Sequence, residues 1–252
     1  MAPAGYGNRV EGIHAVAAAA TRGRVRKLWV EEKRLGRAEI AEIVEAVGRE
    51  KTAPVRDVRP MAETEAPQGV VADCDRIMPT PVDELTGPGA ALVVLDHIED
   101  PHNVGAIARS ALAAGMTGMV VSARRAAPLS ATAFKAAAGA LETLRVSIVG
   151  SVPEGLSRLK KLGVWIVGLE AGSARSLFGL DLLTEPVAVV VGAEGAGLSV
   201  LSAKRCDVLA SIPMALSFES LNASVSAALA CFEIMRVRGE ADPSLQSDLA
   251  PG

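Results

Sequence analysis

The sequence predicts an α/β protein built on a parallel β-sheet, and three observations indicate this. Half of its 252 residues are hydrophobic but only 3% are aromatic, so Ala, Val and Leu must build the core. After residue 90, short and nearly continuous runs of Val, Ile and Leu recur, as is typical of strands buried on both faces. Helical stretches separate most of these runs, as connections between parallel strands require.

The first part of the chain is predicted to be a small α/β domain. Its periodicity indicates a helix over "EGIHAVAAAATRG" (11–23), a strand over 25–32, an amphipathic helix over 38–50 and a closing strand over 68–75. The next segment, 78–90, holds three prolines and two glycines in 13 residues, which predicts a linker.

The second part is predicted to form the parallel sheet. Its strands are expected at 91–96, 118–122, 146–150, 164–169, 187–193 and 208–213. Ligands of such sheets bind beyond the carboxyl ends of the strands. Three of these strand ends carry polar or glycine-rich sequence, and their convergence indicates a functional site.

The first of the three strand ends is "LDHIEDPHNVGAIARSALAAG" (95–115). An apolar stripe should face the sheet, and it consists of Val104, Ile107, Ala108, Ala111 and Leu112. Arg109 lies off this stripe and is expected to point to solvent or a cleft, while Asn103 stands at the helix start. As a structural alternative, Asn103 is a helix cap and Arg109 a surface residue. Gly105 is unfavourable in a helix, which close approach to a ligand would explain.

The second strand end is the glycine-rich "VAVVVGAEGAGLS" (187–199). Its spacing is not G-x-G-x-x-G and no Lys-Ser/Thr follows, so neither a dinucleotide site nor a P-loop is supported. Glu194 in the turn argues further against a phosphate ligand. A cationic or hydroxyl-bearing ligand suits the turn better.

The third strand end gathers Ser220, Asn222 and Ser224 between a strand and an alanine-rich helix. Ser217 or Ser220 could cap that helix, but capping accounts for one serine only, so we interpret the cluster as a binding site. The apolar face of the helix is predicted to run through Val225, Ala228, Leu229, Phe232 and Met235.

Composition limits the function further. The formal net charge of −3 gives no global basic field, although seven Lys or Arg stand against two acids between Arg22 and Arg37. This run is either a solvated helix end and strand edge or an RNA-facing patch. Isolated Cys74, Cys206 and Cys231 indicate free thiols in a reducing compartment, and no metal site is expected. Without a membrane-spanning run or signal peptide, a soluble cytoplasmic protein is expected.

Together, the three strand ends resemble the SpoU (TrmH-like) branch of the SPOUT methyltransferases, which use S-adenosylmethionine to methylate ribose 2′-hydroxyls of RNA. The resemblance covers about 90–240. It rests on N-x-G-x-x-x-R at Asn103, Gly105 and Arg109, on G-x-E-x-x-G at Gly192, Glu194 and Gly197, and on Ile212-Pro213-Met214 with Ser220-Leu221-Asn222-Ala223-Ser224. Leu216 stands where the family commonly has glycine, and Glu219 precedes the motif serine.

The resemblance also implies a domain organisation. "GIHAV" (12–16) and "QGVVA" (68–72) are similar to the RNA-binding domain that resembles ribosomal protein L30e, in the enzymes that methylate a guanosine of large-subunit ribosomal RNA. An L30e-like domain is therefore expected at 1–77, a linker at 78–89, a methyltransferase domain with a C-terminal trefoil knot at 90–240 and a flexible tail at 241–252.

By the same resemblance, the catalytic residues are Asn103, Arg109, Glu194, Ser220 and Asn222, and main-chain groups of Gly192, Ile212 and Leu221 hold S-adenosylmethionine. A homodimer acting on RNA is implied. Arginine is a poor general base because it stays protonated, so Arg109 is expected to fix a phosphate and stabilise the forming alkoxide. The alternatives are a methyltransferase for transfer RNA, a non-catalytic RNA-binding or ribosome-assembly factor on this fold, and an oxidoreductase, which lacks its glycine fingerprint.

Overall fold

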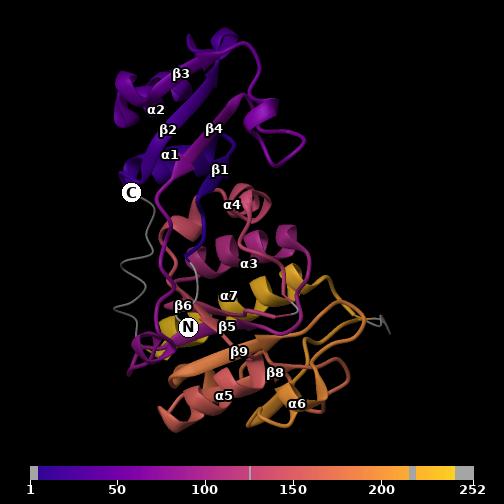
Figure 1. The fold of residues 1–252 in the computed structure, drawn as a ribbon. Helices are drawn as coiled ribbons and strands as arrows, with labels where there is room; N and C mark the ends of the chain where they lie inside the picture. The colour runs from indigo at the N-terminus through magenta and orange to yellow at the C-terminus, as the bar shows by residue number, and fades with distance from the viewer. Residues whose placement is uncertain (1–4, 125, 216–219, 242–252) are drawn as a thin grey trace. The chain divides into compact units, whose positions relative to one another are not determined.

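A computed structural model describes residues 5–124, 126–215 and 220–241 of the chain (Figure 1). These residues form two compact units. The first comprises the described residues of Met1–Pro79, Asp100–Arg109 and Ala127–Thr143, and the second those of Thr80–Glu99, Ser110–Ala126 and Leu144–Gly252. Leu216, Ser217 and Glu219 lie outside the described residues, as does the predicted tail beyond residue 241.

The first unit is built on a four-stranded sheet with the order β1-β4-β2-β3. Strands β2 and β3 are parallel, whereas β4 is antiparallel to β1 and β2. Helix α1 contacts β1 and β4, and α2 contacts β2 and α1, so the two helices cover one face. The elements are β1 (Arg9–Glu11), α1 (Ile13–Thr21), β2 (Val25–Glu31), η1 (Glu32–Arg34), α2 (Ala38–Val47), η2 (Arg49–Lys51), β3 (Thr52–Val55), η3 (Arg59–Met61) and β4 (Val70–Cys74).

The two predicted helices and two predicted strands of this part are confirmed as α1, α2, β2 and β4. Strands β1 and β3 give no sequence signal, because three and four residues are too few to show a periodicity. Strand β3 also contains Pro54, which is compatible with its place at the sheet edge since proline cannot donate a ladder hydrogen bond.

Helix α3 (Pro101–Ala113) begins in the first unit, which also holds α4 (Ala131–Ala137) and η5 (Ala140–Glu142). A Cβ atom at Gly105 would lie only 2.3 Å from the carbonyl oxygen of Ala133 and 2.6 Å from the Cβ of Ala136. Close packing of α3 against α4 therefore explains this glycine, and the ligand contact that its sequence context suggests is not needed.

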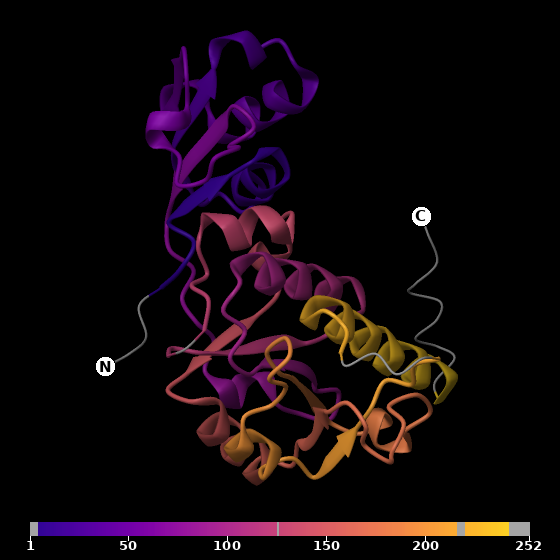
Figure 2. The same ribbon diagram turned by 90° about the vertical axis from the view of Figure 1, so that its right-hand side faces the viewer.

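The second unit is built on a six-stranded sheet with the order β10-β8-β9-β5-β6-β7. Figure 2 shows the chain from a second side. Every neighbouring pair is parallel, and each residue of β5 and β9 is buried. The predicted parallel sheet, buried on both faces, is confirmed. The elements are η4 (Val82–Leu85), β5 (Ala91–Leu95), β6 (Gly118–Ser122), β7 (Val146–Val149), α5 (Val152–Lys161), β8 (Trp165–Leu169), η6 (Asp181–Thr184), β9 (Val187–Val191), α6 (Val200–Ala203), β10 (Val208–Ala210) and α7 (Ala223–Ala241).

Helix α5 packs on one face of this sheet, where Leu156 and Leu159 join Ile166 and Val190 in the core. The same core includes Val82 and Leu85 of η4. The middle of the predicted linker at 78–89 is therefore packed into the second unit.

Helix α7 contacts β9 and β5 and lies on the opposite face from α5 (Figure 1). Its buried side chains are mostly small and include Ala223, Ala227, Ala230, Cys231 and Ile234. The predicted apolar face is not the buried one, because Val225, Leu229 and Phe232 are 45%, 37% and 42% exposed. Small side chains let the helix approach the sheet closely, so the larger ones are turned outward. Neither α7 nor any other helix among the described residues combines the length and apolarity that crossing a membrane requires.

Arg238 ties the end of α7 to the loops that precede β5 and β9. Its guanidinium donates hydrogen bonds to the carbonyl oxygens of Leu183, Gly89, Ala90 and Glu185, over 3.0, 3.0, 2.8 and 2.7 Å. Burial lowers the pKa of Arg238 from its usual value, while the charge of the Glu185 carboxylate acts in the opposite direction. Arg238 therefore supplies hydrogen-bond donors to carbonyl groups that burial would otherwise leave without a partner.

Replacing this clamp should destabilise the second unit. We expect Arg238→Met to lower the free energy of unfolding by about 2 kcal/mol or more, because several carbonyls lose a charged donor at once. Lys161→Met, an exposed change at the end of α5, should alter it by less than about 0.5 kcal/mol. Chemical denaturation of both variants measures the free energy of unfolding. Equal values for the two variants would contradict the stabilising role assigned to the hydrogen bonds of Arg238.

Candidate functional site

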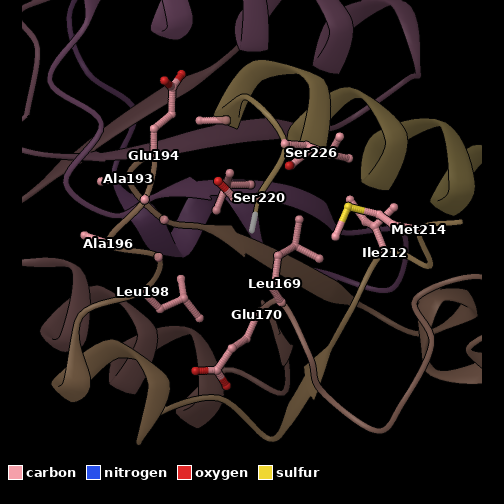
Figure 3. Close-up of a pocket in the computed structure, with 17 residues that line it drawn as sticks. Leu169, Glu170, Ala193, Glu194, Ala196, Leu198, Ile212, Met214, Ser220 and Ser226 are labelled. Atoms are coloured by element: carbon pink, nitrogen blue, oxygen red, sulfur yellow. The ribbon is translucent and has the colours of Figure 1, made fainter. Parts of the chain in front are cut away.

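A pocket lies beyond the carboxyl ends of β8, β9 and β10 in the second unit (Figure 3). It brings together five of the residues predicted for the site, namely Gly192, Glu194, Ile212, Ser220 and Leu221. Residues without a sequence signal also line it, above all Leu169 and Glu170 at the end of β8. Gly168 and Gly172 flank that strand end, but no family motif falls there, so only the sheet order reveals that it faces the same pocket.

The loop after β9 folds back on itself and forms one wall of the pocket. Ala193 and Gly197 exchange two backbone hydrogen bonds, of 3.1 and 2.8 Å. A Cβ atom at Gly192 would lie 2.1 Å from the carbonyl carbon of Gly197, which no side chain could accept. Gly195 and Gly197 have φ angles of 72° and 65°, in the left-handed region that favours glycine. The backbone conformation of the loop therefore requires these glycines, whether or not a ligand is bound.

Asp96, at the end of β5, holds both ends of this loop, and it was not singled out by the sequence. Its side chain is fully buried, and one carboxylate oxygen accepts a 2.8 Å hydrogen bond from the backbone N–H of Ser199. The other lies 2.8 Å from Nδ1 of His97, and the backbone N–H of Asp96 donates to Val191 over 2.9 Å. The sequence contains one signal that could have identified Asp96, namely an acidic residue directly after a buried strand.

Asn222 connects the loop to helix α7. Its Oδ1 accepts hydrogen bonds from the backbone N–H groups of Ser224 and Val225, over 2.9 and 3.3 Å, so Asn222 is the helix cap. Its Nδ2 donates to the carboxylate of Glu194. Ser220 precedes the helix and lines the pocket, so the alternative in which Ser220 caps the helix is not observed. Asn222 both caps the helix and binds Glu194.

The pocket combines apolar walls with two carboxylates. Glu170 and Glu194 are both exposed and lie at opposite ends of the pocket in Figure 3, while Met214 and Ile212 supply apolar surface. No Lys, Arg or His is found among the described lining residues. This environment suits a ligand that joins an apolar ring to hydroxyl and cationic groups, and it disfavours a phosphate.

The two remaining predicted residues lie on α3 in the first unit. Arg109 is exposed, while Val104 and Ile107 of the predicted stripe are buried, so its expected position off that stripe is confirmed. Asn103 lies within the first turn, where the Oδ1 of Asp100 accepts the N–H of His102 over 2.9 Å. Across the described residues, no three His, Cys, Asp or Glu side chains gather closely enough to hold a metal ion.

Known families match both parts of the chain. Residues 90–232 match the SpoU rRNA Methylase family, and residues 9–80 match a domain described as RNA 2′-O ribose methyltransferase substrate binding.

Individual relatives agree with these matches. The 23S rRNA (guanosine-2′-O-)-methyltransferase RlmB of Coxiella burnetii is 35% identical over 245 residues, which are 93% of this chain and 98% of that protein. The protein called "Uncharacterized tRNA/rRNA methyltransferase slr0955" of Synechocystis is 48% identical over 154 residues, 61% of this chain but only 40% of its own length. The crystal structure of AviRb from Streptomyces viridochromogenes with AdoMet has a TM-score of 0.78 and 26% identity, over 92% of this chain and 90% of that one.

The contacts of Asp96 lead to a test of the loop. Asp96→Asn keeps the shape of the side chain but leaves one acceptor oxygen where two now act. We expect amide hydrogen exchange over 192–199 to become about tenfold faster or more, since a hydrogen bond to a charged group contributes about 1.5–3 kcal/mol. Hydrogen-exchange mass spectrometry measures the effect. The exposed Asp181→Asn in η6 is the matched control, and equal exchange in both variants would reject the role of Asp96.

Proposed function

The chain belongs to the SpoU rRNA Methylase family, and on this premise we propose that it transfers a methyl group from S-adenosylmethionine to a ribose 2′-hydroxyl of RNA. A guanosine of large-subunit ribosomal RNA is the substrate we favour, because the Coxiella relative named for that reaction aligns over nearly its whole length. The observation that carries the proposal is the pocket in which Gly192, Glu194, Ile212, Ser220 and Leu221 meet.

The pocket fits S-adenosylmethionine in chemistry. Apolar side chains of Leu198, Ile212 and Met214 suit an adenine ring, and the carboxylates of Glu170 and Glu194 suit hydroxyl and cationic groups. Main-chain groups at Gly192, Ile212 and Leu221 would hold the adenosine part. When bound, this cofactor supplies the electrophilic methyl group. Excluding water and aligning the two reactants there can supply several kcal/mol of the rate enhancement.

We assign the binding of the substrate RNA to Arg109. A guanidinium group only donates hydrogen bonds, so it can bind a phosphate through its planar fork and stabilise the alkoxide as the 2′-hydroxyl loses its proton to phosphate or water. Asn103, Ser220 and Asn222 would orient Arg109 and the ribose. Glu194, held by Asn222, would position Arg109 or contact the substrate.

Residues 1–77 are proposed to be the RNA-binding domain, similar in fold to ribosomal protein L30e. Their match to a substrate-binding domain over 9–80 supports this. The methyltransferase domain would then occupy 90–240, connected through 78–89.

We further infer that the methyltransferase domain ends in a trefoil knot, which the segment 211–234 would thread; residues 216–219 of it lie outside the described residues. Two hydrogen bonds support the proposal, because they join the loop after β8 to Ser211 and to Glu233: Leu177 N–H donates to Ser211 over 2.8 Å, and Gly179 N–H donates to Glu233 of α7 over 2.7 Å. A homodimer is proposed as well, because the exposed apolar side chains Val225, Leu229 and Phe232 line one side of α7.

Cofactor binding is the first test. Isothermal titration of the protein with S-adenosylmethionine should give saturable binding that survives EDTA, because the pocket provides no metal-ligand cluster among the described residues. NAD and ATP should not bind, since the described residues that line the pocket include no cationic group for their phosphates. RNA binding without any heat from S-adenosylmethionine or its demethylated product would favour a non-catalytic RNA-binding factor and contradict the proposal.

Arg109 provides the second test. Because its side chain is exposed, Arg109→Ala should change the free energy of unfolding by less than about 0.5 kcal/mol and leave cofactor affinity intact. Single-turnover transfer of labelled methyl to ribosomal RNA should nevertheless fall by about 10²- to 10⁴-fold. Arg109→Lys should restore little, since a point charge cannot replace the planar fork.

The matched control is Arg145→Ala, an exposed arginine of the second unit that does not line the pocket. It should keep the normal transfer rate. A near-normal rate of methyl transfer in Arg109→Ala would contradict the catalytic assignment and show that Arg109 is an ordinary surface arginine.

A further inference from the structure

A second pocket lies at one end of the sheet in the first unit, where three chain segments meet. One segment follows β2, one follows β3 and one precedes β4. The lining residues are Glu31, Lys33, Arg34, Arg56, Asp57, Arg59, Ala66, Pro67, Gln68 and Gly69. The pocket encloses about 720 Å³ and opens to solvent through the exposed side chains of Lys33, Arg56 and Arg59. None of these residues belongs to the proposed methyl-transfer site.

Four cations face two carboxylates in this pocket, which leaves an excess of positive charge. Lys33 and Arg34 lie 3.0 and 3.4 Å from one carboxylate oxygen of Glu31, and hydrogen bonding from Lys33 is the main cause that lowers the pKa of Glu31. Hydrogen bonds from Arg59 lower the pKa of Asp57 to about 2. Both acids therefore stay ionised and paired at neutral pH, and the exposed Arg56 has no ion-pair partner among the described residues.

The pocket is organised before any ligand arrives. A Cβ atom at Gly69 would lie 2.2 and 2.3 Å from Cδ and Nε of Arg34, so the arginine side chain lies directly against the glycine backbone. The φ angle of Gly69 is 76°, and its carbonyl oxygen accepts the N–H of Glu31 over 3.0 Å. Arg34 is thereby held between Gly69 and Glu31 with its side chain only 26% exposed. Such restraint reduces the entropy that ligand binding would cost.

The lining chemistry indicates the class of ligand. Guanidinium groups bind phosphate through paired hydrogen bonds, whereas the described residues that line the pocket include no aromatic ring on which a base could stack. Two further cations lie outside the pocket: Arg9 of β1 and Lys27 of β2 are 5.4 and 5.0 Å from the ring of Trp29, and Arg9 also pairs with Asp73 over 3.0 Å. Lys27 therefore adds positive charge on the neighbouring sheet surface, which favours a polyanion over a single phosphate compound.

We propose that Lys33, Arg34, Arg56 and Arg59 form a binding site for backbone phosphates of the RNA substrate. The site deepens the proposed function and rests on it. It would anchor RNA without reading its sequence, because phosphate contacts fix position and carry no base information.

The test compares two double variants of the full chain. Arg56→Gln with Arg59→Gln removes two charges from the pocket, and Arg49→Gln with Lys51→Gln removes two exposed charges from η2, before β3. Filter binding to in vitro transcribed large-subunit ribosomal RNA is measured between 0.05 and 0.3 M KCl (roughly the range in which phosphate contacts dominate). The pocket variant should bind about tenfold more weakly and lose about 1–2 units of the slope of log Kd against log salt, while the control stays within about twofold.

Other outcomes decide against the site. Equal weakening in both double variants would show that only net charge matters, and unchanged binding in both would exclude RNA from this pocket; either result overturns the proposal. Calorimetry could instead show that GMP or pyrophosphate binds with a Kd below about 1 mM and that the pocket variant loses this binding. That result would assign the pocket to a free phosphate compound and overturn the proposal. Wild-type titration with S-adenosylmethionine separates this test from the proposed function, because that titration can fail while the RNA measurements still succeed. Thermal melts confirm that each variant is folded.

Discussion

The close approach of the backbone at Gly192 and Gly197 is the constraint on which the candidate site depends. Nothing larger than hydrogen fits on Gly192, so the loop after β9 can return sharply and form a wall of the pocket. Asp96 then fixes the exit of the loop through Ser199, and Asn222 fixes Glu194 within it. Residues that follow β5 and β10 thus fix the loop that follows β9, so the packed sheet positions this wall of the pocket.

Helix α7 joins the site to the core. At its start, Asn222 caps the helix and binds Glu194; near its end, Arg238 gathers carbonyl groups of the loops before β5 and β9. Between them, small side chains press against the sheet and leave Leu229 and Phe232 outside. A shift of α7 would therefore move Asn222 at the pocket and Arg238 at the starts of β5 and β9 at the same time. It would also move the exposed side chains of Leu229 and Phe232.

The basic run at 22–37 is divided by the fold. Arg24 binds Glu142 through a salt bridge and is largely structural, whereas Lys33 and Arg34 enter the pocket with Arg56 and Arg59. The run thus contributes one residue to an internal ion pair and two residues to the pocket. Cations distant in sequence complete the pocket because β2 and β3 are parallel neighbours, whose carboxyl ends lie side by side.

The sequence by itself determined the parallel sheet, the order of its strands along the chain and the three polar strand ends, because buried runs and motifs are local patterns. It also placed Arg109 off the apolar stripe of its helix. Only the tertiary structure decided that Gly105 serves packing, that Asn222 is the cap, that Asp96 and Glu170 belong at the pocket, and that α7 buries its alanines. Each of these depends on which strands are neighbours and how closely backbones approach, and neither property is encoded in a single segment.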